Sequence, residues 1–297
     1  MTPLYDAHFH LQFDSLGPHL GALDADLRGI GYRAGVVNGT NEDEWPVVAQ
    51  LSRRFPWVVP SHGLHPWDCG NRTSAWQTRL RAAVTADDRA HVGEIGLDRW
   101  IVEGVRPGDP RLAGLRVAPL DEQAEVFAWQ LALAAEFNRT ASIHCTQAFG
   151  VLLEVLRTTA LPARGFLLHG YGGPAEMVKT FADLGAYFSY NVEALQPRHA
   201  AQLASFKAVP ADRLLVETDA PVKAPPPERN RFPLGSDADG STINHPGNIA
   251  VAYDALAELR GVALPPLAAQ VEENFRRLFL SDADSRPRRE PLAPAPA

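Results

Sequence analysis

Two histidines near the start of the chain have the spacing of metal ligands. His8 and His10 flank Phe9 in the segment DAHFH, which follows a short apolar run. Side chains alternate along a β-strand, so both imidazoles point to the same side and can bind one metal ion. With 10 histidines in the chain, a His-x-His arises by chance with a probability of about 0.3, so the pair alone is a weak signal.

Four further residues of metal-binding type close apolar, β-rich segments of the sequence. They are Glu94 in HVGEIGLD, His144 in ASIH, His169 in GFLLH and Asp219 in RLLVETD. Each has a simpler explanation when taken alone, since a carboxylate can cap the next helix and a histidine can be a hydrogen-bonded core residue. A buried carboxylate is costly, however, unless it is paired or bound to a metal.

The elements that would position these residues alternate between strands and helices. Strands are predicted at 4–8, 34–38, 57–63, 91–95, 141–145, 166–169, 186–191 and 214–218, with amphipathic helices between them, such as 122–137 and 176–184. Eight such repeats indicate a parallel sheet closed into a barrel. Periodicity alone leaves an open, doubly wound sheet as an equal alternative.

A barrel would bring the six candidate ligands together. They follow the predicted strands one, four, five, six and eight, and the carboxyl ends of barrel strands surround one mouth. Four imidazoles and two carboxylates suit zinc, manganese or similar ions. We therefore predict an α/β fold, a single (β/α)₈ TIM-type barrel, regular or distorted, over residues 1–280. The segment 281–297 has no apolar periodicity and is predicted to be a disordered tail.

Composition and charge exclude several classes of function. The chain has 297 residues, 45% of them hydrophobic, and a net charge of −7, so no general basic field attracts nucleic acid. Metal ions and local cations could still hold a nucleic-acid substrate. Cys69 and Cys145 form no close pair, and neither a signal peptide nor a membrane-length apolar run is present. We expect a cytoplasmic protein without a membrane partner; its oligomeric state stays open, and a monomer is compatible with the sequence.

Two long loops also leave the carboxyl ends of strands. Residues 99–120 contain several glycines and prolines, and residues 222–242 are rich in proline and charge. Barrel enzymes build their sites from such loops. The second loop carries Arg229 and Arg231, which could contact phosphates, although a solvated charged loop is the more common explanation. The sequence assigns no role to the first loop.

Around these positions and along most of its length, the chain resembles the TatD family of metal-dependent deoxyribonucleases, within the amidohydrolase-like barrels. The matching segments are DAHFH at 6–10, GLHPW at 63–67, VGEIGLD at 92–98, SIHC at 142–145, LLHGYGG at 167–173, LLVETDAP at 214–221 and VEENFRRLF at 271–279. The resemblance implies two divalent ions, zinc, manganese or magnesium. It assigns His8, His10 and Asp219 to one ion and His144 and His169 to the other, with Glu94 as the bridge.

The resemblance also implies substrate contacts, which are less secure. His65 would face a substrate phosphate, with a role in holding the turn before Pro66 as the alternative. The family often has Ser-Arg after the histidine that matches His144, where this chain has Cys145 and Thr146. The segments after His169 and in the last loop depart similarly, so the nuclease specificity is less firmly implied than the metal site.

The mechanism expected from this ligand set is hydrolysis by an activated water. Two cations lower the pKa of a bridging water and polarise a phosphoryl or carbonyl oxygen. Asp219 would accept the proton of that water, and Glu217 would either orient a ligand histidine or serve as a surface or cap residue. The favoured function is hydrolysis of DNA, from a single strand or an end. Hydrolysis of a small ester, lactone or amide is the alternative. An inactive scaffold would have lost a ligand, and all six are present.

Overall fold

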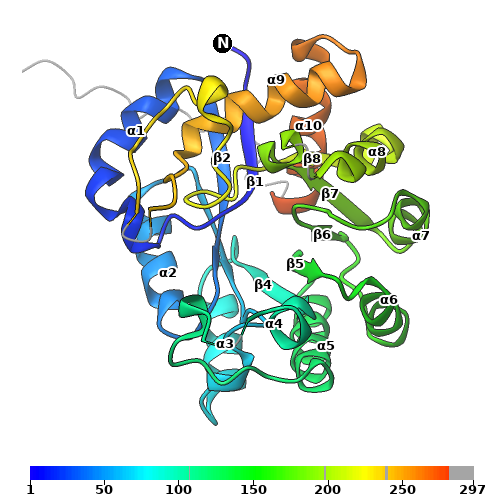
Figure 1. Cartoon of the computed structure of the whole chain (residues 1–297). Coiled ribbons are helices and arrows are strands. Elements are labelled where there is room, and N and C mark those ends of the chain that lie inside the picture. Colours follow the sequence, from blue (N-terminus) through cyan, green and yellow to red (C-terminus); the bar gives the residue numbers. More distant parts are fainter. Residues whose placement is uncertain (107, 197–198, 238–239, 281–297) are drawn as a thin grey trace, which may run out of the picture.

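Eight parallel strands form the centre of the molecule, and their spatial order is their order in the sequence (Figure 1). The computed structural model describes residues 1–106, 108–196, 199–237 and 240–280. The predicted tail, 281–297, lies outside the described residues. The strands are β1 (Leu4–Phe9), β2 (Tyr32–Gly39), β3 (Val58–His62), β4 (His91–Asp98), β5 (Ala141–Thr146), β6 (Phe166–Leu168), β7 (Ala186–Tyr190) and β8 (Leu214–Val216).

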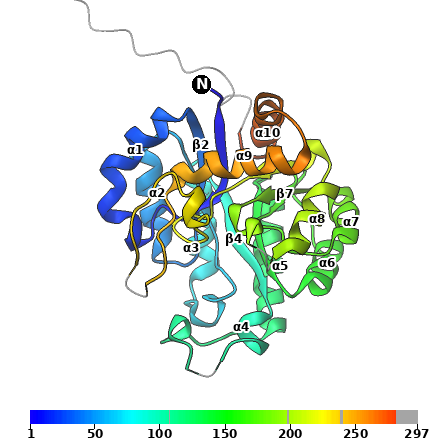
Figure 2. The ribbon, with the colours of Figure 1, turned by 45° about the horizontal axis from the view of Figure 1, so that its top comes forward.

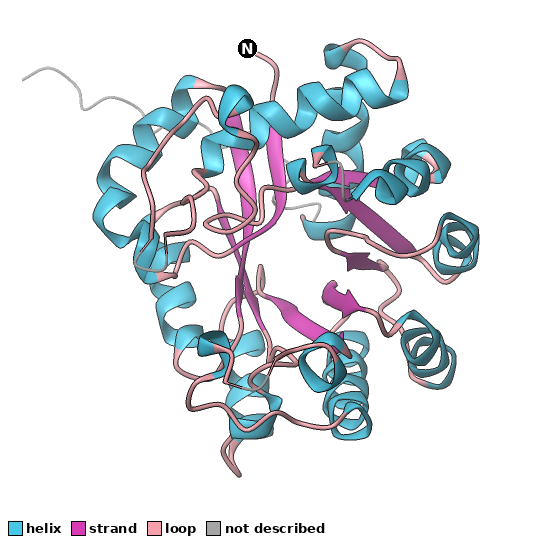
Figure 3. Ribbon diagram, in the orientation of Figure 1, coloured by secondary structure: helices cyan, strands magenta, loops and turns pink. Residues whose placement is uncertain are grey.

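Helices surround the strands and cover the outer face of the sheet (Figure 3). The α-helices are α1 (Leu20–Gly29), α2 (Glu44–Arg54), α3 (Trp76–Thr85), α4 (Trp100–Glu103), α5 (Leu120–Glu136), α6 (Phe149–Thr158), α7 (Val178–Asp183), α8 (Ala200–Ala208), α9 (Ile249–Arg260) and α10 (Leu264–Phe279). Short 3₁₀ helices are η1 (Asp14–His19), η2 (Cys69–Asn71), η3 (Pro110–Leu112), η4 (Ala175–Met177), η5 (Val192–Leu195), η7 (Ala211–Arg213), η8 (Pro227–Arg229) and η9 (Pro246–Asn248).

The sheet closes into a barrel through hydrogen bonds between β1 and the residues that follow β8. The backbone N–H of Asp219 donates to the carbonyl oxygen of His8 at 3.0 Å, and that of His10 donates to Ala220 at 2.7 Å. These bonds join the last strand to the first, so the barrel prediction is confirmed and the open-sheet alternative is wrong. They also place Asp219 directly beside the His-x-His pair.

The hydrophobic core lies mainly between the sheet and the helices. Phe127 and Leu131 of α5 are fully buried, and α5 packs along β4. On the other side of the barrel, the ring of Phe275 in α10 lies 4.9 Å from that of Tyr5 in β1. Outer residues of the strands thus hold the helices, and inner residues remain available for a site.

The predicted strands match the observed ones, with one informative difference at β4. This strand continues to Asp98, so Glu94 lies in its middle and not at its end. Val92 pairs with Ala141 of β5, but Ile95 pairs with Ile143, so β4 has one residue more than β5 over this stretch. Such a β-bulge redirects side chains and is common beside active sites.

The two predicted loops have little regular structure of their own. Residues 99–120 contain α4 and η3, and this part of the chain lies at the edge of the molecule (Figure 2). Residues 222–242 contain η8 among their described positions. Among the helices described, none has the length and apolar character needed to cross a membrane.

Candidate metal centre

Glu94 is the centre of a buried cluster of histidines inside the barrel mouth. Its Oε2 atom lies 3.3 Å from Nε2 of both His8 and His10. Its Oε1 atom lies 2.8 Å from Nε2 of His169 and 3.0 Å from Nδ1 of His144. The two oxygens of one carboxylate therefore face two different pairs of imidazoles. This is the arrangement that a carboxylate bridging two ions requires.

The bulge in β4 and a glycine after it make room for this cluster. Gly96 pairs with His144 of the neighbouring strand and has a φ of +139°, which residues with a side chain rarely adopt. A Cβ atom at Gly96 would collide with the carbonyl oxygen of His144. The glycine thus allows β4 and β5 to approach closely where Glu94 and His144 meet.

The first group of potential ligands consists of His8, His10 and Asp219. Oδ1 of Asp219 lies 3.4 Å from Nε2 of His10 and 3.8 Å from Nε2 of His8. The second nitrogen of each imidazole is held by the barrel: Nδ1 of His10 donates to the carbonyl oxygen of Asn38 at 2.9 Å, and Nδ1 of His8 lies 3.0 Å from Ser142 Oγ. These bonds orient the Nε2 atoms toward one another, as second partners of metal-binding histidines do.

The second group consists of His144 and His169, whose Nδ1 and Nε2 atoms, respectively, are 3.3 Å apart. Nε2 of His144 lies 3.3 Å from Oδ2 of Asp98, at the end of β4. Nδ1 of His169 lies 3.7 Å from Oε1 of Glu217, which is fully buried. The orienting role considered for Glu217 therefore has structural support, and a surface position for it is wrong.

Glu217 is itself held firmly. The amide of Asn191 donates to its Oε1 at 2.9 Å, and the hydroxyl of Ser189 donates to its Oε2. Both residues come from β7 or its end, so a neighbouring strand orients the carboxylate that faces His169.

The carboxylates in the cluster carry negative charge, and the imidazoles around them differ in protonation. Burial, and then the imidazole of His169, lower the pKa of His8 to about 4. Burial acts in the same direction on His10, but Asp219 and Glu94 outweigh it and raise the pKa of His10 to about 9. Burial would raise the pKa of Glu94, yet the surrounding imidazoles hold it well below its usual range. The carboxylates are thus ionised, and imidazole nitrogens converge on them.

The donor set therefore fits divalent metal ions. Ligand atoms of His8, His10 and Asp219 lie within 4.8 Å of one another, and so do those of His8, Glu94 and His169. Imidazole nitrogen and carboxylate oxygen are ligands that zinc and manganese accept. A buried set of this kind, in which the barrel holds the remote nitrogens of His8 and His10, is suited to hold metal ions.

His65 joins the cluster, and it also holds the turn before Pro66. Its Nε2 lies 3.3 Å from Oε1 of Glu94, while its Nδ1 accepts a hydrogen bond from the backbone N–H of Trp67 at 3.2 Å. The imidazole therefore holds the turn with one nitrogen and faces the cluster with the other. Its contact with a substrate phosphate stays a prediction.

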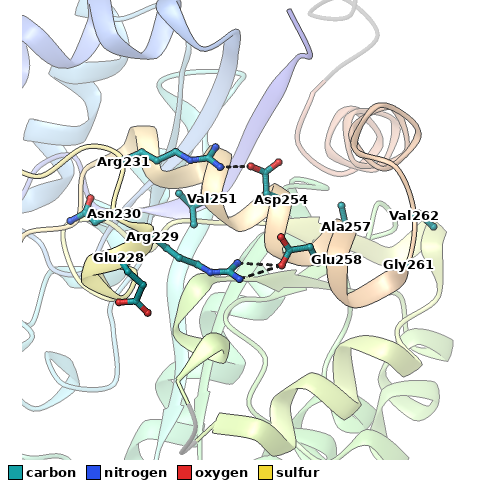
Figure 4. Close-up of a pocket in the computed structure, with 10 residues that line it drawn as sticks. All are labelled: Glu228, Arg229, Asn230, Arg231, Val251, Asp254, Ala257, Glu258, Gly261 and Val262. Carbon is teal, nitrogen blue, oxygen red and sulfur yellow. Dashed lines mark hydrogen bonds and ion pairs between the residues drawn. The ribbon is translucent and has the colours of Figure 1, made fainter.

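Arg229 is not brought to the cluster. Its guanidinium pairs with Glu258 of α9 at 3.3 Å, and the neighbouring Arg231 pairs with Asp254 at 2.7 Å (Figure 4). Both arginines line a pocket of about 630 Å³ between η8 and α9. The role of Arg229 in substrate binding stays a prediction. To reach the metal centre, its side chain would have to leave Glu258.

Two residues near the cluster were not singled out from the sequence. Asp98 accepts a hydrogen bond from Trp67 Nε1 at 2.8 Å as well as facing His144. It lies four residues after Glu94, a spacing that puts both on one face of a strand and could have identified it. Lys223, whose Nζ lies 3.2 Å from Oδ2 of Asp219, is in a loop without periodicity and carried no such signal.

Comparison with known proteins agrees with this geometry. Over residues 5–280 the sequence matches the family described as TatD related DNase. The uncharacterized metal-dependent hydrolase YabD of Bacillus subtilis (strain 168) is 26% identical over 277 residues, covering 93% of this chain and 98% of the relative. The 3′-5′ ssDNA/RNA exonuclease TatD of Citrobacter koseri is 28% identical over 263 residues, covering 87% and 90%.

Solved structures show the same fold. The TatD homologue YjjV from Escherichia coli K12 superposes with a TM-score of 0.78 at 24% identity, covering 93% of this chain and 97% of that one. A TatD family hydrolase from Entamoeba histolytica gives a TM-score of 0.77 at 16% identity, covering 94% and 99%. With its buried histidine–carboxylate clusters and its match along nearly the whole barrel, this chain belongs to the TatD family of metal-dependent hydrolases.

Proposed function

We propose that this protein is a deoxyribonuclease that hydrolyses phosphodiester bonds of single-stranded DNA or DNA ends. The observation that carries the proposal is the position of Glu94, with one oxygen toward each pair of imidazoles. In this proposal His8, His10 and Asp219 would hold one divalent ion, His144 and His169 would hold the other, and Glu94 would be a ligand of both. Zinc, manganese and magnesium are the candidates.

When bound, the two ions would supply an activated water and would polarise a phosphoryl oxygen, which makes the phosphorus atom easier for the water to attack. The chain's own residues supply orientation and proton transfer. Asp219 lies beside His8 and His10 with an ionised carboxylate, and we propose that it accepts the proton of the water and passes it to the leaving group. Asp98 lies 3.3 Å from His144 and Glu217 lies 3.7 Å from His169, and we propose that these carboxylates orient the two imidazoles.

The names of relatives support a DNA substrate, whereas the negative net charge of the chain leaves a small-molecule substrate as a second candidate. Relatives such as that of Citrobacter koseri are named 3′-5′ ssDNA/RNA exonucleases. Against this, Arg229 is paired with Glu258, and the net charge is −7. A small ester, lactone or amide hydrolysed at the same centre is therefore the alternative. We propose a cytoplasmic location, and the oligomeric state stays open.

The proposal is tested with purified protein supplied with Mg²⁺, Mn²⁺ or Zn²⁺. End-labelled single-stranded DNA and a panel of esters and lactones serve as substrates. Asp219→Asn is the matched control, because asparagine keeps the shape of the side chain and tolerates the left-handed backbone of this position, whose φ is 54°. We expect metal-dependent release of nucleotides that is lost in the variant. Turnover of esters or lactones without cleavage of DNA would favour the alternative.

A further inference from the structure

We propose that Lys223 is a positioning residue that orients the carboxylate of Asp219. The proposal rests on the proposed function, in which Asp219 binds a metal ion and accepts a proton. Nζ of Lys223 lies 3.2 Å from Oδ2 of Asp219. The other oxygen, Oδ1, faces Nε2 of His10 at 3.4 Å. The ammonium thus holds one oxygen and leaves the other for the cluster.

The backbone around this pair has an unusual conformation at both ends. Asp219 has a φ of 54° and Lys223 a φ of 55°, a left-handed region that residues with a side chain occupy only when their surroundings impose it. The side-chain amide of Asn244 stabilises this turn, because it donates to the carbonyl oxygens of Thr218 at 3.0 Å, Val222 at 3.1 Å and Lys223 at 3.3 Å. A rigid turn therefore returns the lysine to the carboxylate four residues before it.

A second carboxylate keeps Lys223 in place. Oε2 of Glu193, in η5 after β7, lies 3.4 Å from Nζ of Lys223. The ammonium is therefore shared by two carboxylates and only part of its side chain, 30%, is exposed. These two carboxylates offset the charge of the ammonium, which weakens its attraction for a substrate anion. This arrangement favours positioning of Asp219 over direct recognition of a phosphate.

The contact with Lys223 limits the rotation of the Asp219 carboxylate. Without the lysine, Asp219 can rotate about its Cβ–Cγ bond and present both oxygens to the cluster. With the lysine, Oδ2 faces the ammonium and Oδ1 is held toward the cluster. Residues that orient metal ligands in this way commonly change activity by about 10- to 100-fold when they are replaced.

The test compares Lys223→Met and Lys223→Arg with Lys179→Met. Lys179 is an exposed lysine of α7 that pairs with Asp183, so its variant controls for loss of a lysine as such. Two quantities are measured for each protein. The first is the visible absorption of the Co²⁺-loaded protein, which reports the number and geometry of ligands. The second is kcat and KM on single-stranded DNA.

We expect Lys223→Met to bind Co²⁺ with a changed spectrum and to lose about 10- to 100-fold in kcat, with KM changed less than about twofold. Lys223→Arg should restore most of kcat, and Lys179→Met should behave like the wild type. A rise in KM with unchanged kcat would show substrate contact and overturn the proposal. So would an unchanged Co²⁺ spectrum, or a lower melting temperature with kcat unchanged.

Two further outcomes separate this proposal from the proposed function. Wild-type protein that binds Co²⁺ without cleaving DNA would refute the nuclease, while the spectrum would still decide the role of Lys223. Wild-type protein that binds no Co²⁺ would overturn both. If Lys223→Met does not fold, Lys223→Gln carries the same expectations, because it keeps a polar side chain without the charge.

Discussion

Replacement of Glu94 by glutamine tests the metal centre most directly. The substitution keeps the shape of the side chain and removes its charge, so both pairs of imidazoles lose their shared carboxylate. Loss of a residue that only orients a ligand already costs about 10- to 100-fold in metal affinity or activity. Glu94 faces four candidate ligands at 2.8 to 3.3 Å. We therefore expect kcat to fall by at least about 100-fold, which corresponds to about 2.7 kcal/mol in the activation barrier.

The assay combines metal analysis with kinetics. Wild-type protein should bind two ions per chain, and Glu94→Gln at most one. Glu42→Gln is the matched control, since Glu42 is also buried but pairs with Arg79 at 2.8 Å, outside the cluster. The control should bind both ions and keep its activity, even if it is less stable. A Glu94→Gln protein that binds two ions and retains activity within about tenfold of the wild type would refute the bridging role.

Three other substitutions have expected outcomes. Glu217→Gln should lower kcat about 10-fold without a matching loss of melting temperature, because it removes the charge facing His169; an unchanged kcat would contradict this. Gly96→Ala should destabilise the protein by about 1–3 kcal/mol in urea unfolding, because its φ of +139° suits only glycine; equal stability would contradict it. Burial lowers the pKa of His62 to about 4, below the unfolded value of about 6.5, so the folded state binds fewer protons. The free energy of unfolding therefore keeps its full value above pH 6.5 and loses about 3 kcal/mol as the pH falls to 4. In denaturant titrations at a series of pH values, His62→Gln should make this loss of stability smaller. An equal loss in the variant would show that His62 does not cause it.

Strand periodicity predicted eight strands that alternate with helices, but it left a barrel and an open sheet as equal alternatives. The six ligand candidates near strand ends favoured the barrel, in which they meet. His8, His144 and Asp219 lie in or just after strands whose carboxyl ends surround one mouth. Parallel strands in sequential order bring these ends together, so sites far apart in the chain become neighbours without any knowledge of their contacts. Predicted strand positions also agreed with those observed, because short buried strands are marked by their apolar residues.

Only the tertiary structure shows which side-chain atoms of the metal centre contact one another. Glu94 reaches both imidazole pairs from the middle of β4, within a bulge between Val92 and Ile95 that was not predicted from the sequence. Arg229 pairs with Glu258, whereas Lys223, which had no sequence signal, reaches Asp219. Loop side chains are placed by long-range hydrogen bonds and ion pairs, which have no period in the sequence. The sequence alone thus determined which residues could form the metal centre, and the packing of strands and loops decided which atoms face one another.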